Sequence, residues 1–412
     1  MNNYGGYSKK KTLFICLIIF SITYLIYFLT RESDSTPYNN FIRLADALLN
    51  GRLYLIEDAP WIELVHIDDR HYVVPPPLPA FLSVPFVAIW GLSTNQTLIS
   101  ILFGSINISL AYLVARHLTQ NTSVQIWSTV MFGFGTIHWW VASSGGVWVF
   151  SQTVSVTFLF IGILLTFYKY HPLLIGLSVG ATYWSRLTTV LSLPFFLIYT
   201  YDRWYKPENT KSLINRINFK FLVYLGCGIA LFIAFNALYN YGRFGTPFDV
   251  SYYLIPDIFQ EKWYQKGIFD ITYIPRHLKI IFLKLPEYVS GFPYLVPNWN
   301  GLAIWITTPA FIYAFRGGIK NKLALGCWVS ILFIALVNFA HGTWGFTQFG
   351  YRFAVDFYPF LFLLTIKGIG AEIKWHHKIL ILIGIVINLW GVLLIKIYGW
   401  PALAELFPKT TF

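Results

Sequence analysis

Long apolar runs are the feature that most restricts what this 412-residue chain can fold into. A helix that crosses a bilayer needs roughly 20 apolar residues. Runs near this length lie at 13–29, 96–115, 124–142, 148–168, 172–185, 188–201, 220–241, 299–315, 322–340, 356–371 and 379–397. A mean hydropathy of +0.57 leaves more apolar surface than a soluble domain can bury. We therefore expect an all-α polytopic membrane protein with about 11 transmembrane helices, in a range of about 10 to 13. The two short runs 172–185 and 188–201 are separated by Arg186 and are expected to form a broken or tilted pair of helices.

Basic residues predict the orientation of the chain. Lys9, Lys10 and Lys11 precede the first apolar run, and no small-residue cleavage site follows it, which predicts a retained helix with a cytoplasmic N-terminus. The cytoplasmic connections are then short and basic, with Arg203, Lys206, Lys211, Arg216, Lys220, Arg316, Lys320, Lys322, Lys367, Lys374 and Lys378. The net charge of +12 therefore reflects membrane topology, and no nucleic-acid partner is expected.

Two long loops, 30–95 and 243–298, fall on the opposite, extracytoplasmic side. They hold 13 of the 18 acidic residues. Loops longer than about 15 residues in a compact protein are usually functional, so both loops are candidates for the active face. No hydrophilic segment is long enough to fold alone, which predicts a single integral membrane domain, 1–412.

The loop 30–95 contains two predicted short helices. In "YNNFIRLADALLNG", the residues Phe41, Leu44, Ala45, Leu48 and Leu49 recur at helical spacing and Gly51 can end the helix, which predicts an amphipathic helix lying on the membrane. A proline run, 75–77, then gives an extended segment. The apolar stretch 78–90 after it is too short to cross a bilayer, so it should be interfacial or re-entrant.

These residues carry a resemblance to a known family. An acidic residue after the first helix, the "YNNFIRLADALLNG" helix and the "PPLPAFLSVPFVAIWG" turn resemble the first outer loop of the GT-C membrane glycosyltransferases. The similarity is greatest to the branch of protein O-mannosyltransferases and bacterial lipid A aminoarabinose transferases, and "YGRFGTPFDVSYY" and "QFGYRFAVDFYPF" are also similar to bacterial members. Protein O-mannosyltransferases carry an Asp-Glu pair where this chain has Asp34 and Ser35, so the acceptor stays open.

The resemblance implies a GT-C fold, with juxtamembrane helices and a catalytic carboxylate in the first outer loop, in the inner (plasma) membrane of a bacterium. It also implies a polyprenyl-phosphate-linked sugar as donor and inverting transfer to an extracytoplasmic acceptor. Such a transfer needs a base for the acceptor's proton and a cation for the leaving phosphate. Neither the sugar nor the acceptor follows from the sequence.

Asp34 is the predicted base, because it lies just before the amphipathic helix, where helix-end amides would keep it ionised. Its structural alternative is a helix cap. Asp69, beside Asp68, is the second candidate acid or orienting group, with a solvated turn as its alternative. Glu57, Asp58 and Glu63 are interpreted as surface charges.

Arg352 is the predicted phosphate ligand, because a guanidinium matches phosphate oxygens and an arginine near lipid depth is costly. Asp356 follows four residues later, on the same face of a helix, so a structural ion pair is the alternative. Arg186 is a second cation, with snorkelling to the interface as its alternative. Further candidate substrate contacts are Tyr38, His138, Trp148, Arg243 and His341, each with a structural or aromatic-belt alternative.

No metal or other cofactor is expected. The three cysteines, Cys16, Cys227 and Cys327, lie inside apolar runs without paired spacing, and the first loop has no Asp-X-Asp motif. Two other functions stay open. An O-antigen ligase or polymerase also uses lipid-linked glycans, but it would carry its large outer loop late in the chain. A lipid-linked sugar transporter or flippase would place ionisable residues in mid-helix.

Overall fold

Helices dominate the computed structural model, which describes residues 9–59, 62–206 and 216–405. The helices of ten or more residues are α1 (Lys9–Leu29), α2 (Asn40–Leu49), α3 (Leu78–Trp90), α4 (Gln96–Leu118), α5 (Thr122–Phe134), α7 (Val147–Phe167), α8 (Pro172–Ser185), α11 (Phe219–Phe244), α12 (Ile274–Leu283), α14 (Lys322–Phe339), α15 (Tyr358–Ile369) and α16 (Trp375–Glu405).

Shorter pieces connect them. These are the α-helices α6 (His138–Ser144), α9 (Leu193–Tyr199), α10 (Tyr201–Trp204) and α13 (Ile304–Thr307), and the 3₁₀ helices η2 (Leu187–Ser192), η7 (Pro309–Gly317) and η8 (Arg352–Phe357), besides single 3₁₀ turns in the loops. The described strands form two antiparallel hairpins, β1 (Leu64–Ile67) with β2 (Arg70–Val73) and β3 (Glu287–Tyr288) with β4 (Leu295–Val296).

The predicted all-α polytopic membrane class is confirmed. Within the described residues, six helices are long and apolar enough to cross a membrane alone: α1, α4, α7, α11, α14 and α16. The run 172–185 forms the single helix α8, and the remaining apolar runs are built from consecutive shorter pieces. The run 124–142 divides into α5 and α6, the run 299–315 consists of α13 and η7, and α15 follows directly on η8.

The predicted break at Arg186 is also confirmed. α8 ends at Ser185 and η2 begins at Leu187, while Arg186 itself has an extended backbone with φ −146°. This break turns the guanidinium away from the helix axis and toward the interior of the bundle.

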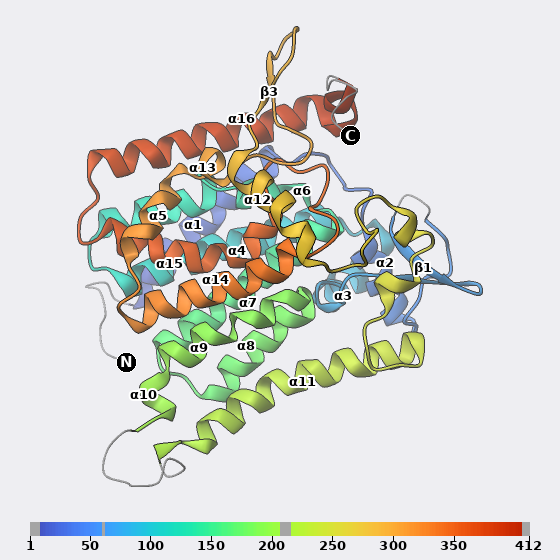
Figure 1. Ribbon diagram of the computed structural model, residues 1–412, viewed down its shortest axis with the longest axis horizontal. Helices are drawn as coiled ribbons and strands as arrows, with labels where there is room; N and C mark the ends of the chain where they lie inside the picture. Colours follow the sequence, from blue (N-terminus) through green and yellow to red (C-terminus); the bar gives the residue numbers. More distant parts are fainter. Residues whose placement is uncertain (1–8, 60–61, 207–215, 406–412) are drawn as a thin grey trace.

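α7 is the central helix of the bundle. In Figure 1, α16 and α11 border opposite sides, and α7 runs between them. In α7, 83% of the most apolar 18-residue segment is buried inside the protein, whereas in α1 the buried share of the corresponding segment is 11%. A helix buried on all sides needs no lipid-facing surface, so its polar residues can serve the interior.

Glycines set the contact between α8 and α11. A Cβ on Gly228 would lie 2.5 Å from the backbone nitrogen of Leu177, and one on Gly176 would collide with the carbonyl oxygen of Leu225. Small residues at such crossings let two membrane helices approach backbone to backbone. The position of α11 against α8 therefore depends on Gly228.

We expect Gly228→Ala to destabilise the protein by about 1–3 kcal/mol, because the added methyl group meets backbone that cannot move aside. The measurement is the thermal unfolding transition in detergent micelles. Gly226→Ala is the matched control, since a Cβ there meets nothing within 4 Å. Equal transition temperatures for the two variants would contradict this packing.

The two predicted helices of the first loop are present as α2 and α3, and Gly51 follows α2 with φ +69°. The position of α2 at a membrane surface stays a prediction. Its apolar side packs on the protein, with the Phe41 ring 5.8 Å from that of Phe150 in α7. The hairpin β1–β2 was not predicted. α2, α3 and β1 gather at one end of the bundle, here named the loop end (Figure 1).

The second long loop is mostly irregular and returns to the loop end. It carries α12 and the hairpin β3–β4, which projects from the bundle beyond α16 (Figure 1). Residues 249–269 of this loop contribute several side chains to the cavity described next.

Candidate active site

A cavity of about 950 Å³ opens at the loop end, where the end of α1, the start of α7 and the end of α14 meet the two long loops. Its charged lining consists of Glu32, Glu63, Arg186, Asp249, Glu261 and Arg352. Aromatic side chains, among them Tyr38, Trp148 and Tyr252, make up much of the remaining wall. The cavity thus combines convergent charges with apolar surface, as ligand sites do.

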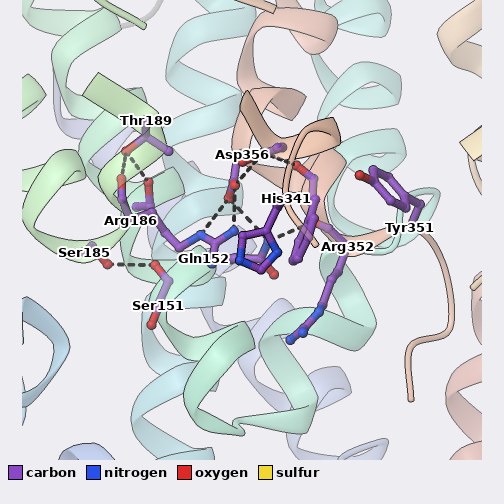
Figure 2. Close-up of polar contacts among 12 residues, drawn as sticks. Ser151, Gln152, Ser185, Arg186, Thr189, His341, Tyr351, Arg352 and Asp356 are labelled. Carbon is purple, nitrogen blue, oxygen red and sulfur yellow. Dashed lines mark hydrogen bonds and ion pairs between the residues drawn. The ribbon is translucent and has the colours of Figure 1, made fainter. Parts of the chain in front are cut away.

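Asp356 anchors the inner wall of this cavity (Figure 2). Its carboxylate is fully buried and accepts from Arg186 through Nη2 at 2.9 Å and Nε at 3.3 Å. Asn338 in α14 donates to it at 3.0 Å, and Gln152 in α7 at 3.3 Å. A buried carboxylate needs such donors to offset its lost hydration. One side chain therefore ties α7, α14, η8 and the α8–η2 break together.

The structural alternative for Arg352, an ion pair with Asp356, is not what the structure shows, because Asp356 pairs with Arg186. The segment forms the 3₁₀ helix η8, in which three residues make one turn, so positions four apart diverge. Figure 2 shows the Arg352 side chain extending away from the Asp356 cluster.

We expect Asp356→Ala to destabilise the protein by about 3–5 kcal/mol, because it leaves the Arg186 charge without its partner and removes one acceptor from Asn338 and Gln152. Thermal unfolding in micelles provides the measurement. Asp202→Ala is the control, since Asp202 forms an ion pair with Lys322 at which both side chains are exposed, and such pairs contribute about 0–1 kcal/mol. A small effect of Asp356→Ala, matching the control, would contradict the anchoring role.

Arg352 has a fixed backbone and an unpaired side chain. Its N–H donates to Gln348 at 3.0 Å, and its carbonyl accepts from Gln152 at 2.8 Å. Within the described residues, no ion pair joins its guanidinium to a carboxylate, and its buried Nε has no hydrogen-bond partner. Unsatisfied donors on a cation inside a cavity are suited to an anionic ligand.

Two neighbours shape the position of this guanidinium. Gly345 has φ +79°, and a Cβ there would lie 2.6 Å from Nε of Arg352, so only glycine leaves room for the side chain. The Trp148 ring centre is 5.7 Å from the guanidinium carbon. Burial, with Arg186 nearby, lowers the pKa of Arg352 to about 10, which keeps it charged at neutral pH.

Glu32 and Glu63 are the two cavity carboxylates contributed by the first long loop. Ser144 donates to Glu32 at 2.8 Å, and the indole N–H of Trp148 donates to Glu63 at 3.4 Å. Burial raises the pKa of both carboxyls above the ordinary glutamate value. For Glu63, the Glu261 carboxylate adds to this shift and the Arg352 charge opposes it. Both side chains are therefore stronger proton acceptors than exposed glutamates.

Five of the residues singled out from sequence line the cavity: Tyr38, Trp148, Arg186, His341 and Arg352. The Tyr38 and Trp148 ring centres are 5.1 Å apart, and the ring planes are tilted by 51°. The Nδ1–H of His341 donates to the Thr343 carbonyl oxygen at 2.9 Å. Burial lowers the pKa of His341 to about 4, so it is neutral at physiological pH.

Asp34 and Asp69 do not line the cavity. The Asp34 side chain is 93% exposed and pairs with Arg31, and the helix α2 is preceded by Asn39 rather than by this aspartate. Asp69 is exposed in the turn between β1 and β2. Asp34 therefore does not cap α2, which was its structural alternative, and the acidic lining of the cavity comes from other residues.

Arg243 and His138 contact other parts of the protein, and neither residue lines the cavity. Arg243 is buried and donates to the Val73 carbonyl oxygen at 2.8 Å, which joins α11 to the end of β2. His138 is fully buried and lies 3.1 Å from the Asn107 amide nitrogen.

Glu32 was not predicted as a site residue, and Glu63 was interpreted as a surface charge. Both are only partly exposed and face the cavity. For Glu63 a signal existed, because it is flanked by the apolar residues of "WIELV". Glu32 lies two residues before Asp34, in the segment that follows the first apolar run.

Comparisons with known proteins identify the fold. No family model matches the chain, and no curated protein matches its sequence. Its structure is similar to the crystal structure of ArnT from Cupriavidus metallidurans bound to undecaprenyl phosphate, with a TM-score of 0.52 and 11% sequence identity. The similarity covers 90% of this chain and 62% of the ArnT chain. The chain therefore shares its fold with ArnT over most of its length, as the resemblance predicts.

Proposed function

We propose that this protein transfers a sugar from a polyprenyl-phosphate donor to an extracytoplasmic acceptor, with inversion at the anomeric carbon. The observation that carries the proposal is the cavity in which the unpaired Arg352 guanidinium and the Glu63 carboxylate meet. The fold shared with ArnT, whose structure contains undecaprenyl phosphate, supports the class of donor.

Arg352 is the proposed phosphate ligand. Cleavage of the bond between the anomeric carbon and the phosphate oxygen leaves both electrons on the phosphate, and a fixed cation stabilises that charge. Arg186 also lines the cavity, but Asp356 holds its Nε and Nη2 in a bidentate pair. Arg352 therefore has more unsatisfied donors available for a ligand.

Glu63 is the proposed base, in place of Asp34. The acceptor hydroxyl attacks the anomeric carbon, and its proton passes to the carboxylate. Glu63 lies close enough to Arg352 for their charges to act on each other, yet the two form no ion pair in the described structure. Glu32, held by Ser144, is the second carboxylate of the cavity and is proposed to orient the acceptor.

The sugar is proposed to lie on the aromatic wall. Tyr38 and Trp148 present adjacent rings beside Arg352, and aromatic faces bind the C–H face of a sugar while excluding water. His341, neutral and adjacent in the lining, can exchange hydrogen bonds with sugar hydroxyls. The proposed chemistry takes its base and its cation from the chain and includes no divalent ion.

The basic connections and acidic loops support a plasma-membrane location with the N-terminus in the cytoplasm and the loop end outside. The direct test of function offers purified protein a panel of polyprenyl-phosphate sugars and identifies by mass spectrometry which donor is consumed when acceptors are present. Consumption of one donor with release of polyprenyl phosphate is expected. Movement of intact donor across liposomes without cleavage would instead identify a flippase.

We expect Glu63→Gln to lower the rate of sugar transfer on the order of 10²-fold or more, because glutamine cannot accept the acceptor's proton. Transfer in the unsubstituted protein should fall as the pH drops through the raised pKa of Glu63, above the ordinary value of about 4.3. The assay measures polyprenyl phosphate released at each pH. Loss of transfer in Asp34→Asn with full activity in Glu63→Gln would contradict this assignment.

Arg352→Ala should weaken binding of undecaprenyl phosphate about 10- to 100-fold, since charged hydrogen bonds contribute about 1.5–3 kcal/mol. Isothermal titration in nanodiscs measures the dissociation constant. Lys279→Ala, at an exposed position on α12, removes the same charge outside the cavity and serves as the control. An unchanged dissociation constant in Arg352→Ala would remove this residue from the phosphate site.

A further inference from the structure

Three potential metal ligands meet on the hairpin β1–β2, outside the cavity. Asp58, His66 and His71 each offer one ligand atom, and these atoms lie within 4.8 Å of one another. His66 Nε2 is 3.6 Å from the Asp58 carboxylate, and the two imidazole rings are 4.8 Å apart. The three residues come from three segments, because His66 is in β1, its cross-strand partner His71 is in β2, and Asp58 precedes the hairpin.

The polar groups of this cluster are poorly satisfied by the chain alone. Nδ1 of His71 is shielded from solvent and has no hydrogen-bond partner among the described residues. The Asp58 carboxylate accepts the Ala59 N–H at 2.8 Å and otherwise faces the His66 ring. A cation between the three groups would give this imidazole the partner that it lacks.

The ligand set indicates the chemical class of the cation. Two imidazoles and one carboxylate suit zinc and related divalent transition metals, whereas magnesium and calcium prefer sites made of oxygen ligands. Zinc ligands lie about 2.0–2.2 Å from the ion, so small side-chain rotations bring these atoms into place. The Asp58 and His66 side chains are 43% and 42% exposed, which leaves a path for the ion.

The position of the cluster indicates a structural role for the cation. Glu63 directly precedes β1 and Val74 directly follows β2, and both line the cavity. The segment before the hairpin is joined to β2 through backbone hydrogen bonds between Leu55 and His71, at 2.8 and 3.2 Å. A metal ion would add a side-chain link across the same three segments.

We propose that Asp58, His66 and His71 bind one divalent transition-metal ion, of which Zn²⁺ is the probe, and that the ion clips the hairpin β1–β2 to the segment before it. The site is separate from the sugar-transfer chemistry and acts by fixing the part of the first loop that carries Glu63. It holds whether or not the protein is a glycosyltransferase.

The test uses the full chain in detergent, with the affinity tag removed and bound metals stripped by EDTA. Equilibrium dialysis against micromolar Zn²⁺ and elemental mass spectrometry give the bound equivalents. The unsubstituted protein should bind one equivalent more than His66→Gln/His71→Gln, and hydrogen exchange in residues 62–74 should slow only when that equivalent is bound. Mg²⁺ at the same concentration should have no effect.

Two further variants make the result decisive. Asp58→Asn keeps the shape of the side chain, so it should fold, and should weaken Zn²⁺ binding about tenfold or more. Glu57→Gln removes the neighbouring exposed carboxylate and should bind like the unsubstituted protein. Equal zinc stoichiometry and affinity in the unsubstituted protein and in Asp58→Asn would overturn the proposal.

Discussion

The buried carboxylate of Asp356 is the interaction on which the functional end of this protein depends. It collects donors from Arg186, Asn338 and Gln152, three residues that lie far apart along the chain. A charge without water in the interior is costly unless every partner is in place. The ends of α7, α8 and α14 are therefore held in one arrangement, and the cavity takes its shape from that arrangement.

The Asp356–Arg186 ion pair gives the two cavity arginines different roles. Arg186 is neutralised by Asp356 and serves mainly as part of the wall. Arg352, whose backbone is fixed by Gln348 and Gln152, points into the cavity with unsatisfied donors. Rigid backbone and unpaired charge together describe a preorganised anion site, which needs little rearrangement when its ligand arrives.

Hydropathy and spacing were sufficient to predict the helical class, the positions of α2 and α3, and the break at Arg186, because each depends on local sequence. The orientation of the Asp34 side chain could not be predicted from local sequence. The chain between α1 and α2 is set by contacts with residues 61 positions away, Asn95 to the Asp34 carbonyl and the Thr36 N–H to Thr97. These contacts turn Asp34 to solvent, while Glu32 faces the cavity. The partner of Asp356, 170 positions away, was beyond local reasoning for the same reason.

A structure of the protein with bound undecaprenyl phosphate tests the central claim most directly. The account predicts phosphate oxygens within hydrogen-bond distance, about 3 Å, of the Arg352 guanidinium, with the lipid chain leaving the cavity toward the bilayer. A phosphate bound at the opposite end of the bundle, for example beside Lys322 and Lys367 where a second cavity lies, with Arg352 left without a ligand, would contradict it.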